Sequence, residues 1–175
     1  MMRRNRPITE RMVRAALLDS AVYEEVERDT GATGQAAMVV LIAAVAAGIG
    51  ALLGGSVIGL VTSIVGGIVG WIVWSFLTYW IGTTIFATPQ TRTSPGEMLR
   101  TIGFSHTPGI LRILGFIPIL GPLILFATAV WQLVAGVIAV RQAMDFDTLR
   151  AIGTVVVGWV IVFVVQLILV LLLVG

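Results

Sequence analysis

Hydrophobic residues dominate three long stretches of the chain that contain no charged side chain. They cover residues 30–91, 113–140 and 151–175, which are 62, 28 and 25 residues long. A helix needs about 20 apolar residues to cross a hydrocarbon core about 30 Å thick. The first stretch therefore predicts two membrane-spanning helices and the last predicts one. The middle stretch fits either one crossing or two short ones.

The first stretch divides at a tight turn formed by Gly54, Gly55 and Ser56, which predicts spans over 35–53 and 57–81. Small residues recur four positions apart around this turn, and such spacing lets helix backbones approach closely in lipid. The candidate packing residues are Gly50, Gly54, Gly66 and Gly70. We expect these contacts within the chain, with a homodimer seam as the alternative.

Residues 8–28 predict one or two amphipathic helices on the membrane surface. Apolar residues recur there at helical spacing, and Asp19 is a candidate N-cap for the second helix. Residues 1–14 carry five arginines and one acid, whereas residues 15–29 carry five acids and one arginine. One interpretation is a solvated charged face. The other is a surface for anionic lipid or a basic partner, with candidates Arg11, Arg14, Tyr23, Glu24, Glu25 and Glu27.

The polar segment 83–107 begins a further helix. Ser94-Pro95-Gly96-Glu97 is a capping box with proline at the first helical position, and it predicts a short helix over 95–103. We expect this helix to lie on the membrane surface and to present Met98, Leu99 and Ile102 to it. Arg100 and His106 are candidate contacts for lipid or a partner. His106 has no carboxylate near it in sequence except Glu97, so a loop position is favoured over serine–histidine catalysis.

The stretch from 108 to 140 is broken by Pro118, Gly121 and Pro122, after a helix start at Pro108. We predict a short helix over 108–118 and a longer one over 122–140. Two helices sharing this stretch average about 24 Å in length, which is short of a full crossing. Arg112 is the one charge inside a predicted membrane segment. Its side chain is expected to extend to the headgroups, with attraction of an anion as the alternative.

The arginines decide between the two arrangements of the middle stretch. If the chain enters and returns there, all eleven arginines lie on one side of the membrane. Positive residues concentrate in cytoplasmic loops, so this arrangement is favoured. The prediction is an all-α, polytopic membrane bundle of five transmembrane helices, the third short and proline-broken, preceded by an amphipathic surface helix. The N-terminus is expected in the cytoplasm and the C-terminus outside.

Composition removes several kinds of chemistry. The chain has no cysteine, no lysine and one histidine, which leaves no thiolate nucleophile, zinc–thiolate cluster or Schiff-base lysine. The net charge is only +2 and no dense basic stripe is present, so nucleic acid is not an expected partner. No metal, cofactor or catalytic residue is predicted.

The most specific sequence is Arg100-Thr-Ile-Gly-Phe-Ser-His-Thr-Pro108, followed by Ile117-Pro-Ile-Leu-Gly121. It resembles the Arg-x-x-Gly-aromatic…Pro run and the Ile-Pro-x-x-Gly element of the Yip1 domain. Trp131 and the Arg150-Ala151 pair fit the same pattern, and the resemblance covers about residues 8–173. It implies a cytoplasmic region over 1–33 and a five-helix domain over 34–175.

Eukaryotic relatives in that family are Golgi and endoplasmic-reticulum proteins linked to Rab GTPases. Their Asp-Leu-Tyr-Gly-Pro motif is missing here, with Tyr23-Glu24-Glu25 only faintly similar, so a Rab-binding role is not carried over. The arginine-only basic set is typical of a bacterial member, which predicts a multi-pass protein of the bacterial inner membrane.

The expected function is non-catalytic organisation of membrane or partner proteins through the cytoplasmic face. The expected partners are the lipid bilayer and a membrane protein or a second copy of the chain. The alternative is a small transporter or channel with a site at the broken hairpin 108–140, since interrupted helices often line substrate sites. The lack of a carboxylate inside the three uncharged stretches disfavours that alternative.

Overall fold

The computed structural model describes residues 6–174, with side chains described to residue 168 and at 171 and 172. These residues form eight helical segments and no strand, so the predicted all-α class is confirmed for the described part of the chain. The segments are α1 (Ile8–Ala16), α2 (Ser20–Arg28), α3 (Ala32–Leu53), α4 (Val57–Thr84), α5 (Pro95–Ser105), the 3₁₀ helix η1 (Thr107–Phe116), α6 (Leu120–Ala143) and α7 (Thr148–Val174).

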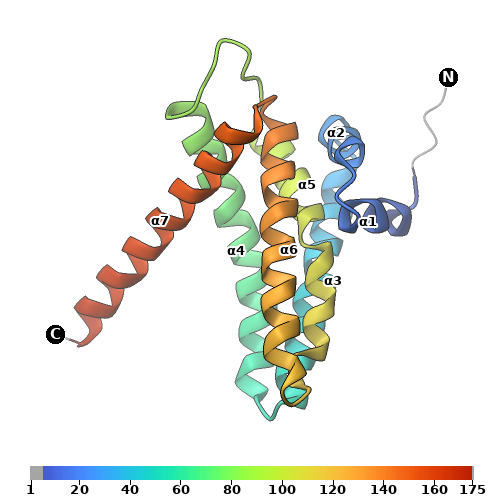
Figure 1. Cartoon of the computed structure of the whole chain (residues 1–175), viewed down its shortest axis with the longest axis vertical. Coiled ribbons are helices and arrows are strands. Elements are labelled where there is room, and N and C mark those ends of the chain that lie inside the picture. The colour runs from blue at the N-terminus through green and yellow to red at the C-terminus, as the bar shows by residue number, and fades with distance from the viewer. Residues whose placement is uncertain (1–5, 175) are drawn as a thin grey trace.

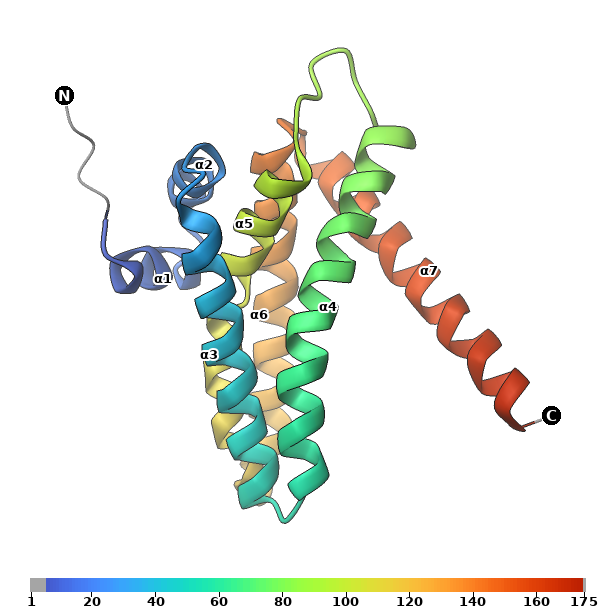
Figure 2. The same cartoon turned by 180° about the vertical axis from the view of Figure 1, so that it is seen from behind.

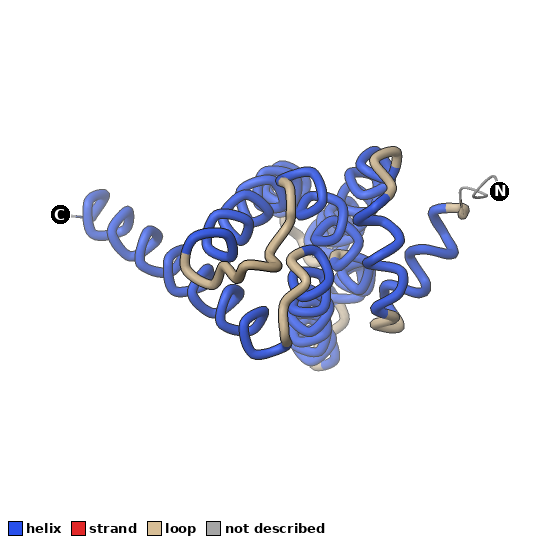
Figure 3. The backbone as a smooth tube through the Cα atoms, turned by 90° about the horizontal axis from the view of Figure 1, so that it is seen from above, coloured by secondary structure: helices blue, strands red, loops and turns tan. Residues whose placement is uncertain are grey.

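The chain travels back and forth along one bundle axis. It descends through α3, returns through α4, descends through α5 and η1, returns through α6, and descends again through α7 (Figures 1 and 2). The first four of these passes lie side by side, whereas α7 diverges from the others as it descends. Seen along the axis, α1 and α2 lie on one side of the bundle and the end of α7 on the opposite side (Figure 3).

Four helices are long and apolar enough to cross a membrane: α3, α4, α6 and α7, the last counted over Thr148–Ile168. Taken over its whole length, the shortest of these four helices is α3, whose 22 residues at 1.5 Å per residue give about 33 Å. The predicted spans over 35–53 and 57–81 therefore correspond to α3 and α4, which begin within three residues of the expected starts. The one span predicted for the last uncharged stretch corresponds to α7.

The helix that follows the capping box is not a surface helix. The reciprocal bonds between Ser94 and Glu97 are present as predicted, but α5 continues to Ser105 rather than ending at Gly103. Its residues Met98 and Ile102 are buried in the core, so the expected exposure to the membrane surface is wrong. α5 descends between neighbouring helices and passes directly into η1 (Figure 2).

Gly103 explains how α5 comes so close to α3. A Cβ atom added there would lie 2.7 Å from Cβ of Ala36 and 3.2 Å from its Cα atom, closer than real Cβ contacts allow. The side chain of Ala36 is itself fully buried. The glycine of the Arg-x-x-Gly element is therefore required by packing between helices rather than by a helix end.

The predicted break in the middle stretch lies at Pro118. η1 ends at Phe116, Ile119 has a φ of +68°, and α6 begins at Leu120. Because η1 is a 3₁₀ helix, it rises about 2.0 Å per residue and is longer than an α-helix with the same number of residues. Gly121 is buried against the backbone of Gly115, where a side chain has no room.

Only some of the predicted packing glycines pack within the chain. A Cβ atom on Gly50 would lie 2.5 Å from the carbonyl oxygen of Arg112, so α3 and η1 are in backbone contact there. Gly54 makes only ordinary contacts at the turn, and an added Cβ on Gly66 or Gly70 meets nothing within 4 Å. The expectation of intramolecular packing at Gly66 and Gly70 is therefore wrong, because both face open space.

Candidate functional site

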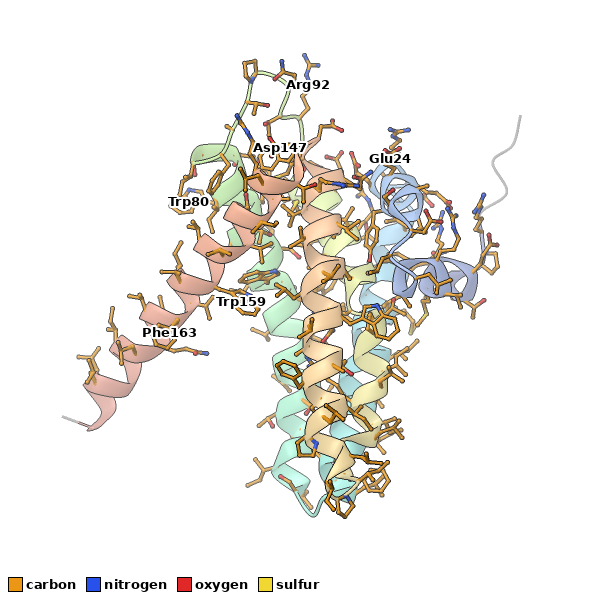
Figure 4. All side chains as sticks on the ribbon, viewed as in Figure 1. Glu24, Trp80, Arg92, Asp147, Trp159 and Phe163 are labelled. Atoms are coloured by element: carbon orange, nitrogen blue, oxygen red, sulfur yellow. The ribbon has the colours of Figure 1, made fainter. Side chains whose placement is uncertain are left out.

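Charged side chains gather at one end of the bundle, which we call the charged end (residues 6–31, 85–100 and 141–150). Glu24, Arg92 and Asp147 mark it in Figure 4. The opposite, uncharged end consists of residues 52–58 and 116–123 and contains no ionisable side chain. Arg112 in η1 is the one described charge that belongs to neither end.

Arg11 joins three elements at the charged end. Its guanidinium donates to Oε1 of Glu25 at 3.0 Å, to Oδ2 of Asp29 at 2.7 Å and to Oε1 of Gln35 at 2.9 Å. The Arg11 side chain is 3% exposed. A cation this well buried is stable only when its donors are satisfied, and here they hold α1 against α2 and the start of α3.

Arg14 extends this network on its exposed side. It donates to Asp19 at 2.8 Å and to Glu25 at 3.2 Å. The hydrogen bond from Arg14 holds the pKa of Asp19 below its ordinary value. Asp19 also caps α2 by accepting from the backbone N–H of Ala21, as its position in the sequence predicts.

Arg100 binds the other end of α2. Its Nε group donates to the carbonyl oxygen of Val26 at 2.9 Å, and its Nη2 group donates to that of Glu27. The last carbonyls of a helix lack partners within the helix and carry partial negative charge. Arg100, which is 5% exposed, therefore caps α2 from α5.

Two tryptophans make comparable ties. Trp131 Nε1 in α6 donates to the carbonyl oxygen of Ala16 at the end of α1, at 2.8 Å. Trp71 Nε1 in α4 donates to the carbonyl oxygen of Leu99 in α5, at 2.9 Å. Arg100 and Trp131, both part of the pattern in the sequence, thus attach the N-terminal helices to the bundle.

Four acidic side chains lie near one another at the charged end: Glu24, Glu27, Glu97 and Asp145. Burial, together with the charges of Asp145 and Glu97, raises the pKa of Glu27 to about 7. Gln142 donates to Glu24 at 3.0 Å and so connects α6 to α2. The excess of negative charge at this point favours a cationic partner.

A cavity of about 750 Å³ lies within the bundle. Its polar wall includes Ser105, His106, Arg112 and Gln132. Small residues of α3 and α4, together with larger apolar side chains of α4, α6 and α7, line the rest. Nη2 of Arg112 donates to Oε1 of Gln132 at 2.6 Å, and Nε2 of Gln132 donates to the carbonyl oxygen of His106 at 3.4 Å. The size and lining are typical of ligand pockets.

The predicted candidate residues fall into three environments. Arg11, Tyr23 and Arg100 are buried and bonded internally, so their side chains are not available to a partner. Arg14, Glu24, Glu25 and Glu27 are partly exposed, although Glu25 is neutralised by Arg11 and Arg14. His106 and Arg112 meet at the cavity, and Pro108 starts η1 beside them.

Sequence reasoning missed the two glutamines. Gln35 and Gln132 are neutral, so neither interrupts an uncharged stretch, but each accepts a hydrogen bond from a buried or half-buried arginine. The usable signal is a lone amide within an apolar helix, because such a group needs a partner in lipid. Within residues 6–174, no three His, Asp or Glu side chains converge on a metal-sized site.

Long apolar helices, with charges gathered at one end, define a helical membrane protein. The family model of the Yip1 domain matches residues 17–170 of the chain. The chain therefore belongs to the Yip1 domain family. No significant match was found among curated proteins or among solved structures.

Proposed function

We propose that this protein is a non-catalytic integral membrane protein that organises membrane or partner proteins through its charged end, and that this end faces the cytoplasm. The observation that supports the proposal is the segregation of charge: Arg112 apart, every charged side chain of the described residues lies at the charged end. Cytoplasmic loops carry the excess of arginine in membrane proteins.

In this proposal the bundle crosses the membrane five times. α5 and η1 together provide the third crossing, since 11 α-helical residues and 10 residues of 3₁₀ helix span about 16 Å and about 20 Å. Residues 1–33 then form a cytoplasmic layer, residues 34–175 form the membrane domain, and the C-terminus is external. The complete alternation of chain direction from α3 to α7 supports this topology (Figures 1 and 2).

The cytoplasmic layer offers two surfaces of different chemistry. Val13 of α1 and Leu17, the residue that directly follows α1, are 59% and 73% exposed. They lie on one face because they are four residues apart. An interfacial helix of this kind buries its apolar face at the headgroup boundary. Glu24, Glu27, Glu97 and Asp145 provide the second surface, which suits a basic segment of a partner protein.

Single-cysteine labelling tests the topology, and the absence of native cysteine makes each site unambiguous. Arg92→Cys and Asp147→Cys are expected to react with a membrane-impermeant maleimide from the cytoplasmic side only. Gly54→Cys is the matched control and is expected to react from the other side only. Reaction of Arg92→Cys and Asp147→Cys from opposite sides contradicts the five-crossing arrangement.

Photo-crosslinking tests the organising role. A photoreactive amino acid at position 24 or 147 is expected to yield discrete protein adducts in native membranes, because both side chains lie at the charged end (Figure 4). The same group at Ile119, on the uncharged end, serves as the control and is expected to yield only lipid adducts. Protein adducts from position 119 with none from 24 or 147 contradict the proposal.

A further inference from the structure

The charge of Arg112 has no counter-ion within the described residues. Among the described residues, its one hydrogen-bond partner is the neutral amide of Gln132, and no carboxylate there lies within ion-pair distance. Arginine stays protonated in proteins, and a half-buried cation with one neutral partner is costly. The cavity at Arg112 therefore carries an uncompensated positive charge.

The other polar groups are arranged around that charge. Oε1 of Gln132 accepts from Arg112, which turns its amide nitrogen toward the carbonyl of His106. Nδ1 of His106 lies 2.8 Å from the carbonyl oxygen of Ile102, so Nδ1 carries a proton and donates. The Nε2 atom has no partner among the described residues and is the remaining polar atom of a ring that lines the cavity.

The rest of the cavity suits hydrocarbon. Its walls include Ala43, Ala44 and Ala47 of α3 and Gly66, Gly67 and Gly70 of α4. Gly66 and Gly70 have no side chain, and the space beside each of them is open.

The cavity opens sideways, between α4 and α6. These two helices make few or no direct contacts, and the lining residues Phe126 and Val130 of α6 are 68% and 44% exposed. Trp159 lies on the side of α7 that faces the bundle and forms another part of the rim (Figure 4). Toward the charged end, Trp71 is buried and bonded to α5.

We propose that this cavity binds an anionic lipid, with its phosphate on Arg112 and an acyl chain along the gap between α4 and α6. The charge selects an anion, and charge-assisted bonds from arginine to phosphate are the strong ones. The sideways opening onto apolar surface selects a molecule that is already in the bilayer. A free phosphate ion has the same charged group as the headgroup, but it has no apolar part to contact the apolar walls.

Tryptophan fluorescence provides the assay, because Trp71, Trp74 and Trp159 line the cavity. The full-length protein in detergent is titrated with phosphatidylglycerol brominated on its acyl chain, and separately with phosphatidylcholine brominated in the same way. Saturable quenching by the anionic lipid, at least about tenfold tighter than by the neutral one, is expected from one charge-assisted contact. Equal quenching by both lipids overturns the proposal.

Variants separate the two parts of the site. Arg112→Gln is expected to abolish the preference for the anionic lipid, and Arg112→Lys to retain part of it. Arg92→Gln, which removes an exposed arginine at the charged end, is the control and is expected to preserve it. Gly70→Leu fills the cavity without meeting any neighbour of its Cβ and is expected to reduce quenching by both lipids.

Thermal stability provides a second measurement that a purely structural role would not reproduce. The anionic lipid is expected to raise the midpoint of unfolding for the native protein and Arg92→Gln, but not for Arg112→Gln. A lower midpoint for Arg112→Gln without lipid, with the lipid-induced rise unchanged, shows that Arg112 only supports Gln132 and overturns the proposal. Inorganic phosphate alone is expected to give no rise, and an equal rise identifies a soluble anion instead of a lipid.

Discussion

Arg11 and Gln35 meet side chain to side chain, with Nη1 of Arg11 2.9 Å from Oε1 of Gln35. This contact connects the first helix of the N-terminal layer to the first long helix of the bundle, 24 positions further along the chain. Glu25 and Asp29 accept hydrogen bonds from the remaining nitrogen atoms of the same guanidinium. The orientation of α1 and α2 therefore depends strongly on one buried cation.

Replacing Arg11 by glutamine is expected to loosen this layer. Glu25 keeps Arg14 as a partner, so we expect a loss of about 2–3 kcal/mol, somewhat below the cost of breaking a fully buried pair. Trypsin cleavage at Arg14, a site that both variants retain, measures the loosening in native membranes as a faster rate. The control is Arg28→Gln. Arg28 is 62% exposed and, among the described residues, forms an ion pair only with Glu24, so this substitution is expected to cost about 0.5 kcal/mol or less. Equal stability of the two variants contradicts the interpretation.

The stability of the charged end is expected to fall as pH rises from about 5 to about 7. Burial, then the charges of Asp145 and Glu97, raises the pKa of Glu27 from an ordinary 4.5 to about 7. The folded state then binds more protons than the unfolded state in this interval, so raising the pH favours unfolding. Because Glu27 is partly solvated, we expect about 1–2 kcal/mol.

Denaturation of the native protein and Glu27→Gln at pH 5 and pH 8 checks this sign. The variant removes the titrating group, so the difference between the two pH values is expected to shrink. Glu10→Gln is the control, because its side chain is 47% exposed and pairs with Arg6 at the surface. A native protein that is more stable at pH 8 than at pH 5 would show that another group dominates.

The sequence predicted those features of the fold that depend on interactions between residues close together in the chain. The capping box at Ser94, the N-cap at Asp19 and the break at Pro118 each depend on neighbours a few residues away. The depth of α5 was not predictable in this way. Its polar residues suggest a surface, but Arg100 is satisfied by carbonyls of α2, 73 and 74 positions away in sequence.

The same distinction applies to the cavity. Arg112 was recognisable from the sequence as the one charge inside a predicted membrane segment. The sequence also suggested its two possible roles, extension to the headgroups or attraction of an anion. Gln132, the partner of Arg112, lies 20 positions further along the chain, in α6. Their contact therefore depends on the turn at 117–119 that connects η1 to α6. The open space at Gly66 and Gly70 depends on where α6 and α7 lie, which glycine spacing does not encode.

Two glycines of the predicted packing set are expected to respond oppositely to the same substitution. Gly50→Ala places a Cβ atom 2.5 Å from the carbonyl oxygen of Arg112, which is backbone and cannot rotate away. We expect a loss of about 1–3 kcal/mol as α3 and η1 separate. Gly66→Ala meets nothing within 4 Å and is expected to be neutral or stabilising by up to about 1 kcal/mol, from helix propensity.

Unfolding of both alanine variants in the same lipid or detergent measures the difference. Gly66 is an appropriate control because it lies, like Gly50, within an apolar helix of the bundle. Equal losses in the two variants would indicate that glycine is needed for backbone flexibility rather than for close approach.

Ile119 at the uncharged end has a backbone conformation that costs free energy. Its φ and ψ are +68° and −49°, and the N–H of Leu120 donates to the carbonyl of Pro118 at 2.7 Å, which defines a γ-turn centred on Ile119. The side chain is 91% exposed, so little packing offsets a conformation that is unfavourable for a β-branched residue. Ile119→Gly is therefore expected to stabilise the protein by about 1 kcal/mol.

Leu123→Gly, a helical position on the same end with an exposed side chain, is the control and is expected to destabilise by about 1 kcal/mol. Chemical or thermal unfolding in one detergent measures both changes in stability. Destabilisation by Ile119→Gly would contradict the prediction, because it would show that contacts of the isoleucine side chain contribute more free energy than the strained turn costs.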